Sequence, residues 1–191
     1  MRSSMCIDSA SPNKKPPQNG TIPKIKERMI LYKKLAVAFS YPDGNFFIFF
    51  PEQKKAKAEL PLEYDRLFRG FEVWLYGAEY MIENEFQRVQ TLVDISGFYK
   101  AFGLEADLNR PDALSCELEF MHYLIFREIN APDKEKVRTC FSAEKNFFLQ
   151  HLYPQAKKIV EKLRLRTRNK FYLEISEILS NFLESERIIY R

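Results

Sequence analysis

The sequence predicts a single all-α domain, a helical bundle of about eight helices, in this chain of 191 residues. Apolar residues recur at steps of three and four in nearly every segment, which is the spacing of one helix face. Only 6 glycines are present, so there is little material for hairpin turns, and prolines and glycines separate the apolar runs. The folded domain is expected over residues 24–191, after a flexible tail over residues 1–23 that is rich in Ser, Pro, Asn and Lys.

Three short helical regions are expected in the first part of the domain. The first helix should end before Pro42 and Gly44, and its inward residues are Ile25, Met29, Tyr32, Leu35, Ala36 and Phe39. The aromatic run NFFIFF (45–50) predicts a short helix or a buried turn, because no partner strand is evident. One or two short helices should begin near Pro61 and break around Gly70.

Five longer helices are expected to follow. The segment EFQRVQTLVDISGFYKAFGL should close at Gly103, and its inward residues are Val89, Leu92, Val93, Phe98 and Phe102. The next helix is expected over 112–130, and Pro132 then restarts the chain. The remaining helices are expected at about 133–151, 154–167 and 169–189.

The composition argues against several classes of protein. A net charge of +4 does not by itself demand nucleic acid or anionic lipid. Three widely spaced cysteines form neither a disulfide framework nor a CxxC site, which favours a reducing compartment and hence the cytoplasm. Residues 1–23 lack the apolar run of a signal peptide. No stretch approaches the roughly 18 apolar residues of a spanning helix, so no membrane insertion is expected.

The helix RPDALSCELEFMHYLIFRE (110–128) carries polar side chains through an apolar run. We expect Asp112 to be its N-cap. At about 100° per residue, one arc of roughly 80° then holds Asp112, Ser115, Glu119 and His122. The opposite side holds Leu114, Leu118, Met121 and Ile125. We expect these four residues to be buried in the centre of the bundle, against the helix that contains Val89 and Val93 and the helix near Phe148.

Three explanations of this polar stripe compete. The first is the wet edge of a surface helix, with Asp112 as a simple cap. The second is a metal site, since Glu119 and His122 have the Glu-x-x-His spacing of di-iron bundles. That site needs a second Glu-x-x-His, but the only other histidine is His151, and Phe148 stands three residues before it. No metal is therefore expected.

The third explanation is a groove for a cationic, partly apolar ligand, because carboxylates can bind arginine while aromatic side chains cover an apolar helix. Catalysis is not expected. Two histidines offer few general bases, Cys116 and Cys140 lack the surroundings of a nucleophile, and neither a P-loop nor a GxGxxG motif is present. No cofactor is expected either.

Several motifs occur in the order typical of one known family. The helix segment PDALSCELEFMHYLIFRE resembles the pattern Pro-Asp-His-Leu, then Glu-Leu-x-Phe-Met, of the TorD/DmsD/NarJ redox-enzyme maturation chaperones. Further similar segments are LAVAFSYPD (35–43), EYDRLFRG (63–70), YGAEY (76–80), FYKAFGL (98–104), FFLQHL (147–152) and FYLEISEIL (171–179). The resemblance covers about residues 30 to 190.

This resemblance implies a TorD-like, all-helical cytoplasmic chaperone without catalytic activity. Its expected partner is the catalytic subunit of a molybdopterin oxidoreductase, bound through the twin-arginine signal peptide or another part until the cofactor is inserted. It leaves open the client, the choice between leader and mature subunit, any nucleotide binding, and whether the chain is a monomer or a homodimer.

Family residues can be carried over only where the motifs match. Pro111 and Asp112 match the Pro-Asp loop, Tyr76 and Tyr80 match a Pro-Tyr-Glu-Ser-x-Tyr segment, and the helix motif is matched by Glu117, Phe120 and Met121. The chain departs from the family pattern at Ala113, Leu75, Gly77 and Gln155, where the family has histidine, proline, glutamate and tryptophan.

The expected peptide-binding residues combine the polar arc with these matches. They are Trp74, Tyr76, Tyr80, Pro111, Asp112, Glu119 and His122. A rival hypothesis is a helical protein that binds nucleic acid or an anionic surface through the basic segment KKIVEKLRLRTRNK (157–170). Nucleic acid is not a partner in the preferred interpretation.

Overall fold

The computed structural model describes residues 24–81, 84–105 and 110–191, so the expected tail over residues 1–23 lies outside the described residues. The described part is helical and contains no β-strand, only an isolated antiparallel bridge between Tyr76 and Ala113. The predicted all-α class is therefore confirmed. None of the helices in these three ranges is long and apolar enough to cross a membrane.

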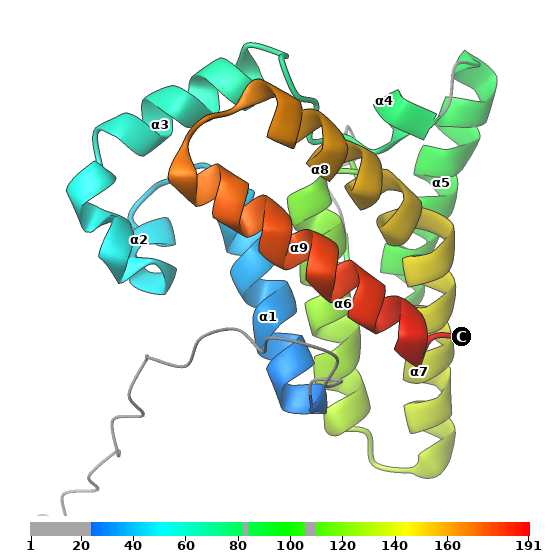
Figure 1. Ribbon diagram of the computed structural model, residues 1–191. Helices are drawn as coiled ribbons and strands as arrows, with labels where there is room; N and C mark the ends of the chain where they lie inside the picture. The colour runs from blue at the N-terminus through cyan, green and yellow to red at the C-terminus, as the bar shows by residue number, and fades with distance from the viewer. Residues whose placement is uncertain (1–23, 82–83, 106–109) are drawn as a thin grey trace, which may run out of the picture.

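Nine α-helices occur in the described ranges (Figure 1). They are α1 (Ile25–Ala38), α2 (Phe46–Phe49), α3 (Glu59–Tyr64), α4 (Ala78–Met81), α5 (Glu85–Ala101), α6 (Leu114–Ile129), α7 (Lys134–Phe147), α8 (Tyr153–Arg166) and α9 (Lys170–Ile189). A 3₁₀ segment, η1 (Pro51–Ala56), and two π-helical turns, η2 (Asp65–Arg69) and η3 (Phe148–Leu152), connect some of them. The run NFFIFF forms the short helix α2, as predicted.

Helix α6 lies at the centre of the bundle, between α1 and α7 (Figure 1). Its four predicted inward residues are all fully buried: Leu114, Leu118, Met121 and Ile125. Helix α1 makes the most extensive contact with α6, and α7 and η3 pack on it as well. The central position of this helix and its predicted contact with the segment near Phe148 are therefore confirmed.

The predicted inward face of α5 was wrong at Val89 and Val93, although the predicted Phe98 and Phe102 do pack against the core. Val89 and Val93 are 54% and 58% exposed, while Ile95 and Tyr99 are the fully buried residues of this helix. The Tyr99 ring packs edge-on against Phe120 of α6, with the centroids 4.7 Å apart. The sequence is apolar on both sides of α5, so periodicity alone cannot choose which side faces the bundle.

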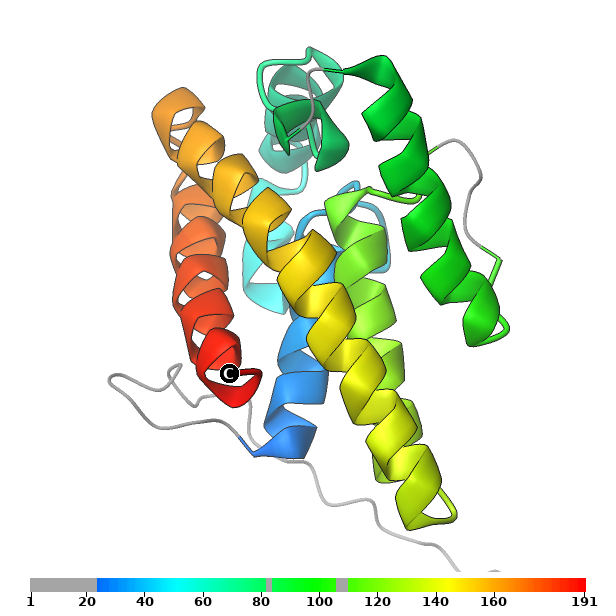
Figure 2. The same ribbon diagram turned by 90° about the vertical axis from the view of Figure 1, so that its right-hand side faces the viewer.

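The expected separation of helices near Pro154 does not occur. Helices α7 and α8 are joined through η3 without a break and form one long helical segment (Figure 2), which changes direction between α7 and α8 (Figure 1). A proline ring in a regular α-helix clashes with the carbonyl four residues earlier, here that of Gln150. The wider π turn just before Pro154 relieves this clash and lets the helix continue.

The predicted N-cap role of Asp112 was also wrong. Ala113 occupies the N-cap position of α6, and no side chain caps this end. The fully buried Asp112 instead accepts a hydrogen bond at Oδ2 from the backbone N–H of Ala78, at the start of α4 (3.0 Å). The Gly77 N–H donates to the Asp112 carbonyl (3.1 Å), and the Leu114 N–H donates to the Leu75 carbonyl (2.8 Å). These three bonds fasten the segment around the start of α4 to the start of α6.

Candidate functional site

A cleft of about 740 Å³ lies between α1, the turn before α2, the end of α5 and the first half of α6. Its wall is rich in aromatic side chains, namely Tyr41, Phe46, Phe49, Tyr99, Phe120 and Tyr123. Ser115 and Cys116, from the first turn of α6, also line it. Both its size and its largely apolar wall are typical of a ligand site.

The charged groups of the cleft are mostly acidic. Asp43, Glu105 and Glu119 bring three carboxylates, against the single ammonium group of Lys33. Lys33 Nζ lies 2.6 Å from Glu119 Oε1, and both side chains are partly exposed. Asp43 Oδ1 accepts the backbone N–H groups of Asn45 (2.9 Å) and Phe46 (3.1 Å). This balance of charge favours a ligand that combines a cation with an apolar body.

Five of the seven predicted binding residues come together elsewhere, around the segment that precedes α4. They are Trp74, Tyr76, Tyr80, Pro111 and Asp112. The Tyr80 hydroxyl accepts the Trp74 N–H (2.7 Å), and the Trp74 and Tyr76 rings lie 6.3 Å apart. The Pro111 carbonyl accepts a hydrogen bond from the Tyr99 hydroxyl (2.8 Å), which connects this cluster to the cleft that Tyr99 also lines.

The chain's own arginines occupy this second cluster. The Arg110 guanidinium lies over the Tyr76 ring, 4.3 Å from its centroid, and donates to Glu79 Oε1 (2.8 Å). Arg88 lies 3.1 Å from Glu79 Oε2. A carboxylate beside an aromatic ring therefore already holds two guanidinium groups here, which is the chemistry expected of a site that recognises arginine.

An exposed aromatic pair extends the same cluster. Phe71 has a positive φ of 60° and stacks on Trp74, with the ring centroids 4.6 Å apart. Positive φ is unusual for a bulky residue and costs on the order of 1–3 kcal/mol. Phe71 is 59% exposed, so this strained backbone presents an aromatic ring to solvent beside Trp74.

The two remaining predicted residues lie on the α1 side of α6. Glu119 lines the cleft, whereas His122 does not and places its Nδ1 2.8 Å from the Met29 carbonyl of α1. The polar arc predicted for Asp112, Glu119 and His122 is thus divided between three surroundings, because different neighbours cover different turns of α6.

A buried acid near the start of α6 explains part of the polar character of this helix. Glu117 is almost fully buried, and neither of its carboxylate oxygens has a hydrogen-bond partner among the described residues. Burial, and then the charge of Asp112, raises the pKa of Glu117 well above its ordinary value, which favours the protonated carboxyl. Burial also raises the pKa of Asp112, although the bond from Ala78 opposes this.

Within the described ranges, no three His, Cys, Asp or Glu side chains are grouped so that they could hold a metal ion. Cys140 is buried, and Cys116 is half-buried at the cleft.

Two of the departures from the family pattern lie in contact. A Cβ atom at Gly77 would come within 1.6 Å of Gln155 Oε1 and 2.6 Å of Gln155 Cβ. The Gln155 side chain therefore fills the space that a side chain at position 77 would need. Nothing in the local sequence indicated this pairing, and the cleft residues Lys33, Asp43 and Glu105 were missed for the same reason: they come from segments far apart in the chain.

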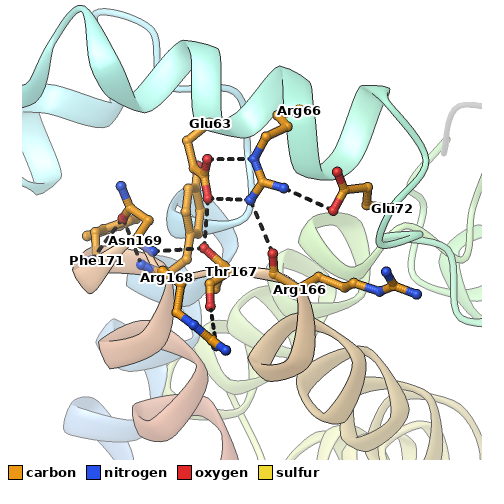
Figure 3. A network of polar contacts seen from close by, with 9 residues as sticks. Glu63, Arg66, Glu72, Arg166, Thr167, Arg168, Asn169 and Phe171 are labelled. Carbon is orange, nitrogen blue, oxygen red and sulfur yellow. Dashed lines mark hydrogen bonds and ion pairs between the residues drawn. The ribbon is translucent and has the colours of Figure 1, made fainter.

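The basic segment 157–170 is partly used inside the fold (Figure 3). Arg66 forms a bidentate pair with Glu63 (2.8 and 2.9 Å) and also donates to the Arg166 carbonyl (3.2 Å). The buried Thr167 donates to Glu63 Oε1 (2.7 Å), and the Asn169 side chain caps α9. The turn between α8 and α9 is thereby fixed to α3 and η2.

Comparison with known proteins identifies the family. Residues 34–161 match the family model described as the nitrate reductase delta subunit. The chain belongs to this family. The match confirms the resemblance to TorD- and NarJ-type proteins found in the sequence motifs.

A curated relative gives a second comparison. The chain is 24% identical over 98 residues to a perchlorate reductase assembly chaperone protein of Dechloromonas aromatica (strain RCB). The aligned region is 49% of this chain and 44% of that protein, so the chain spans less than half the length of this relative. No solved structure matches the chain.

Proposed function

We propose that this protein is a maturation chaperone for a molybdoenzyme. It acts in the cytoplasm without catalysing a reaction, and it binds the twin-arginine leader or another part of the apo catalytic subunit before the cofactor is inserted. Membership of the nitrate reductase delta subunit family and the similarity to an assembly chaperone support this role. The structural observation that carries it is the aromatic cleft with three carboxylates against one ammonium group.

Glu119 is the proposed arginine-binding residue of the cleft. Its partner Lys33 is partly exposed, and ion pairs of this kind contribute only about 0–1 kcal/mol. An incoming guanidinium can replace Lys33, because arginine forms two parallel hydrogen bonds to a carboxylate and lysine does not. The apolar helix that follows the arginines would then lie on aromatic side chains such as Phe49 and Tyr123.

The second cluster is proposed as an extension of this surface. Trp74, Tyr76 and Tyr80 would provide an aromatic wall, and Glu79, which pairs with the chain's own Arg88 and Arg110, would provide a second carboxylate. Asp112 is a positioning residue in this proposal, since it is fully buried and fastens the start of α4. Pro111 and His122 act similarly through their contacts with Tyr99 and Met29.

Calorimetric titration with two synthetic leaders tests the proposal. One peptide carries Arg-Arg before an apolar helix, and the other carries Lys-Lys at the same place. The wild-type chain should prefer the arginine peptide. Glu119→Gln should weaken its binding by about 10-fold, as expected for the loss of one charge-assisted hydrogen bond, and should abolish the preference for arginine.

Glu161→Gln is the matched control, because Glu161 is an exposed carboxylate on α8, outside the cleft, and its ion pair with Lys158 at 3.6 Å is exposed. It should leave both titrations unchanged. Equal affinity of wild type and Glu119→Gln for both peptides would exclude the cleft as the arginine site. Capture of a molybdoenzyme apo subunit by a chain that binds neither peptide would instead place recognition in the mature subunit.

A further inference from the structure

The outer face of α5 carries an apolar stripe that no described part of the chain covers. Phe86, Val89 and Val93 are 77%, 54% and 58% exposed, and their spacing of three and four places them on one side of the helix. Exposed Gly97 continues the stripe by one turn, and a Cβ atom built there would meet nothing within 4 Å. The opposite side of α5 is packed on the bundle. A helix that is apolar on both sides is normally buried on both, so a partner is missing from the outer side.

The position of α5 leaves this stripe accessible. Figure 2 shows α5 at the edge of the bundle, beyond α6 and α7. The stripe also has charged groups of opposite sign at its two ends, the exposed Glu85 in the first turn and the exposed Lys100 in the last. A partner helix that runs antiparallel and has the same order of charges, acidic at its start and basic at its end, would complement both ends.

We propose that a second copy of this chain covers the stripe, with two α5 helices packed antiparallel about a twofold axis that passes midway between Val89 and Val93. In this arrangement Val89 of each copy faces Val93 of the other. The large Phe86 ring faces Gly97, where the space that a side chain would fill is open. Glu85 of one copy comes within reach of Lys100 of the other. A twofold interface requires such self-complementarity, because the same surface serves both sides.

The size of α5 determines how strong this association is. A helix of 17 residues is about 25 Å long, and one of its faces buries less than the roughly 800 Å² per partner of a stable complex. The dimer is therefore a weak one, with a Kd on the order of micromolar or above. It forms as the protein concentration rises and dissociates on dilution.

Sedimentation equilibrium of the full chain, from about 1 μM to about 1 mM, tests the proposal. The wild type should pass from monomer to dimer in this range. Val93→Lys places like charges close to the twofold axis and should raise the Kd at least about 10-fold. Ile188→Lys is the matched control, because Ile188 is exposed to a similar degree (55%) but belongs to α9, and it should leave the Kd unchanged.

Charge reversal tests the antiparallel register separately. Glu85→Lys and Lys100→Glu should each weaken the dimer, and the double variant should restore it, since each reversed charge then meets the other across the interface. A wild type that stays monomeric throughout the range overturns the proposal, and so does a dimer that Val93→Lys does not affect. A monomeric chain whose binding to a client apo subunit is weakened by Val93→Lys would assign the stripe to the client instead.

Discussion

Arg28 in α1 and Glu186 in α9 form a buried bidentate ion pair, with Nε 2.7 Å from Oε1 and Nη2 2.9 Å from Oε2. The pair joins two residues that are 158 positions apart in the chain. The Tyr32 hydroxyl donates to the same carboxylate (2.9 Å), and the Tyr190 hydroxyl donates to the neighbouring Glu144 (2.8 Å). The first and last helices of the described domain are thus connected by a fully buried polar network.

Arg28→Met should destabilise the fold strongly. It leaves the fully buried Glu186 without its cation, and removal of one partner of a buried pair costs about 3–5 kcal/mol. Urea unfolding gives the free energy directly. Arg187→Met is the control: its pair with Glu184 is largely exposed, so the expected cost is below about 1 kcal/mol. Equal effects of the two changes would show that the buried pair contributes no more than a surface pair.

The free energy of unfolding should depend on pH in a way that shows the raised pKa of Glu144. Burial, and then the charge of Glu128, raises the pKa of Glu144 from 4.5 to about 8. The folded chain therefore keeps a proton that the unfolded chain releases above pH 4.5. The contribution of this group to stability is fully present below pH 4.5 and is lost as pH rises towards 8, with a slope of at most about 1.4 kcal/mol per pH unit.

Glu144→Gln replaces the titrating carboxyl group with an amide of the same size, so the variant lacks this contribution to the pH dependence. Buried His151 has a lowered pKa and contributes a slope of opposite sign near neutral pH, so the difference between wild type and variant is the useful quantity. Between pH 5 and pH 8, the wild type should lose stability relative to Glu144→Gln. Parallel curves over this range would mean that Glu144 titrates normally.

Leu118→Ala should cost about 2–5 kcal/mol, as expected for a large-to-small change at a fully buried position of the central helix. Val89→Ala provides the comparison, because the sequence pattern predicted both residues to face inward but only Leu118 does so. The expected cost at Val89 is below about 0.5 kcal/mol. Thermal or urea unfolding of the two variants distinguishes them, and a large loss at Val89 would contradict the position of α5.

Gly77→Ala should destabilise the protein by about 1–3 kcal/mol, because the new methyl group would overlap the buried Gln155 side chain. Gln155→Ala removes the two nearest atoms, Oε1 at 1.6 Å and Cδ at 2.3 Å, but keeps the Cβ at 2.6 Å. The double variant should therefore lose less stability than the sum of the two single variants. Strict additivity in this double-mutant cycle would show that the two positions do not interact.

The sequence alone determined the class of structure and its central element. Periodic apolar residues predicted helices in the right places, and the strongly one-sided apolar face of α6 identified Leu114, Leu118, Met121 and Ile125 as core residues. The ordered motifs indicated the family that the comparison with known proteins then confirmed. These features are local: spacing along the chain decides which residues share one face of a helix.

Only the tertiary structure decided which neighbour each face meets. Helix α5 is apolar on both sides, and contact with Phe120 rather than any local preference turned Tyr99 inward and Val89 outward. Asp112 could have capped its own helix, but the N–H of Ala78, 34 positions away, became its partner. The cleft joins side chains from α1, from α2 and the turn before it, from the end of α5 and the residues that follow it, and from α6. Sequence spacing cannot reveal such groupings, because they depend on how segments far apart in the chain pack together.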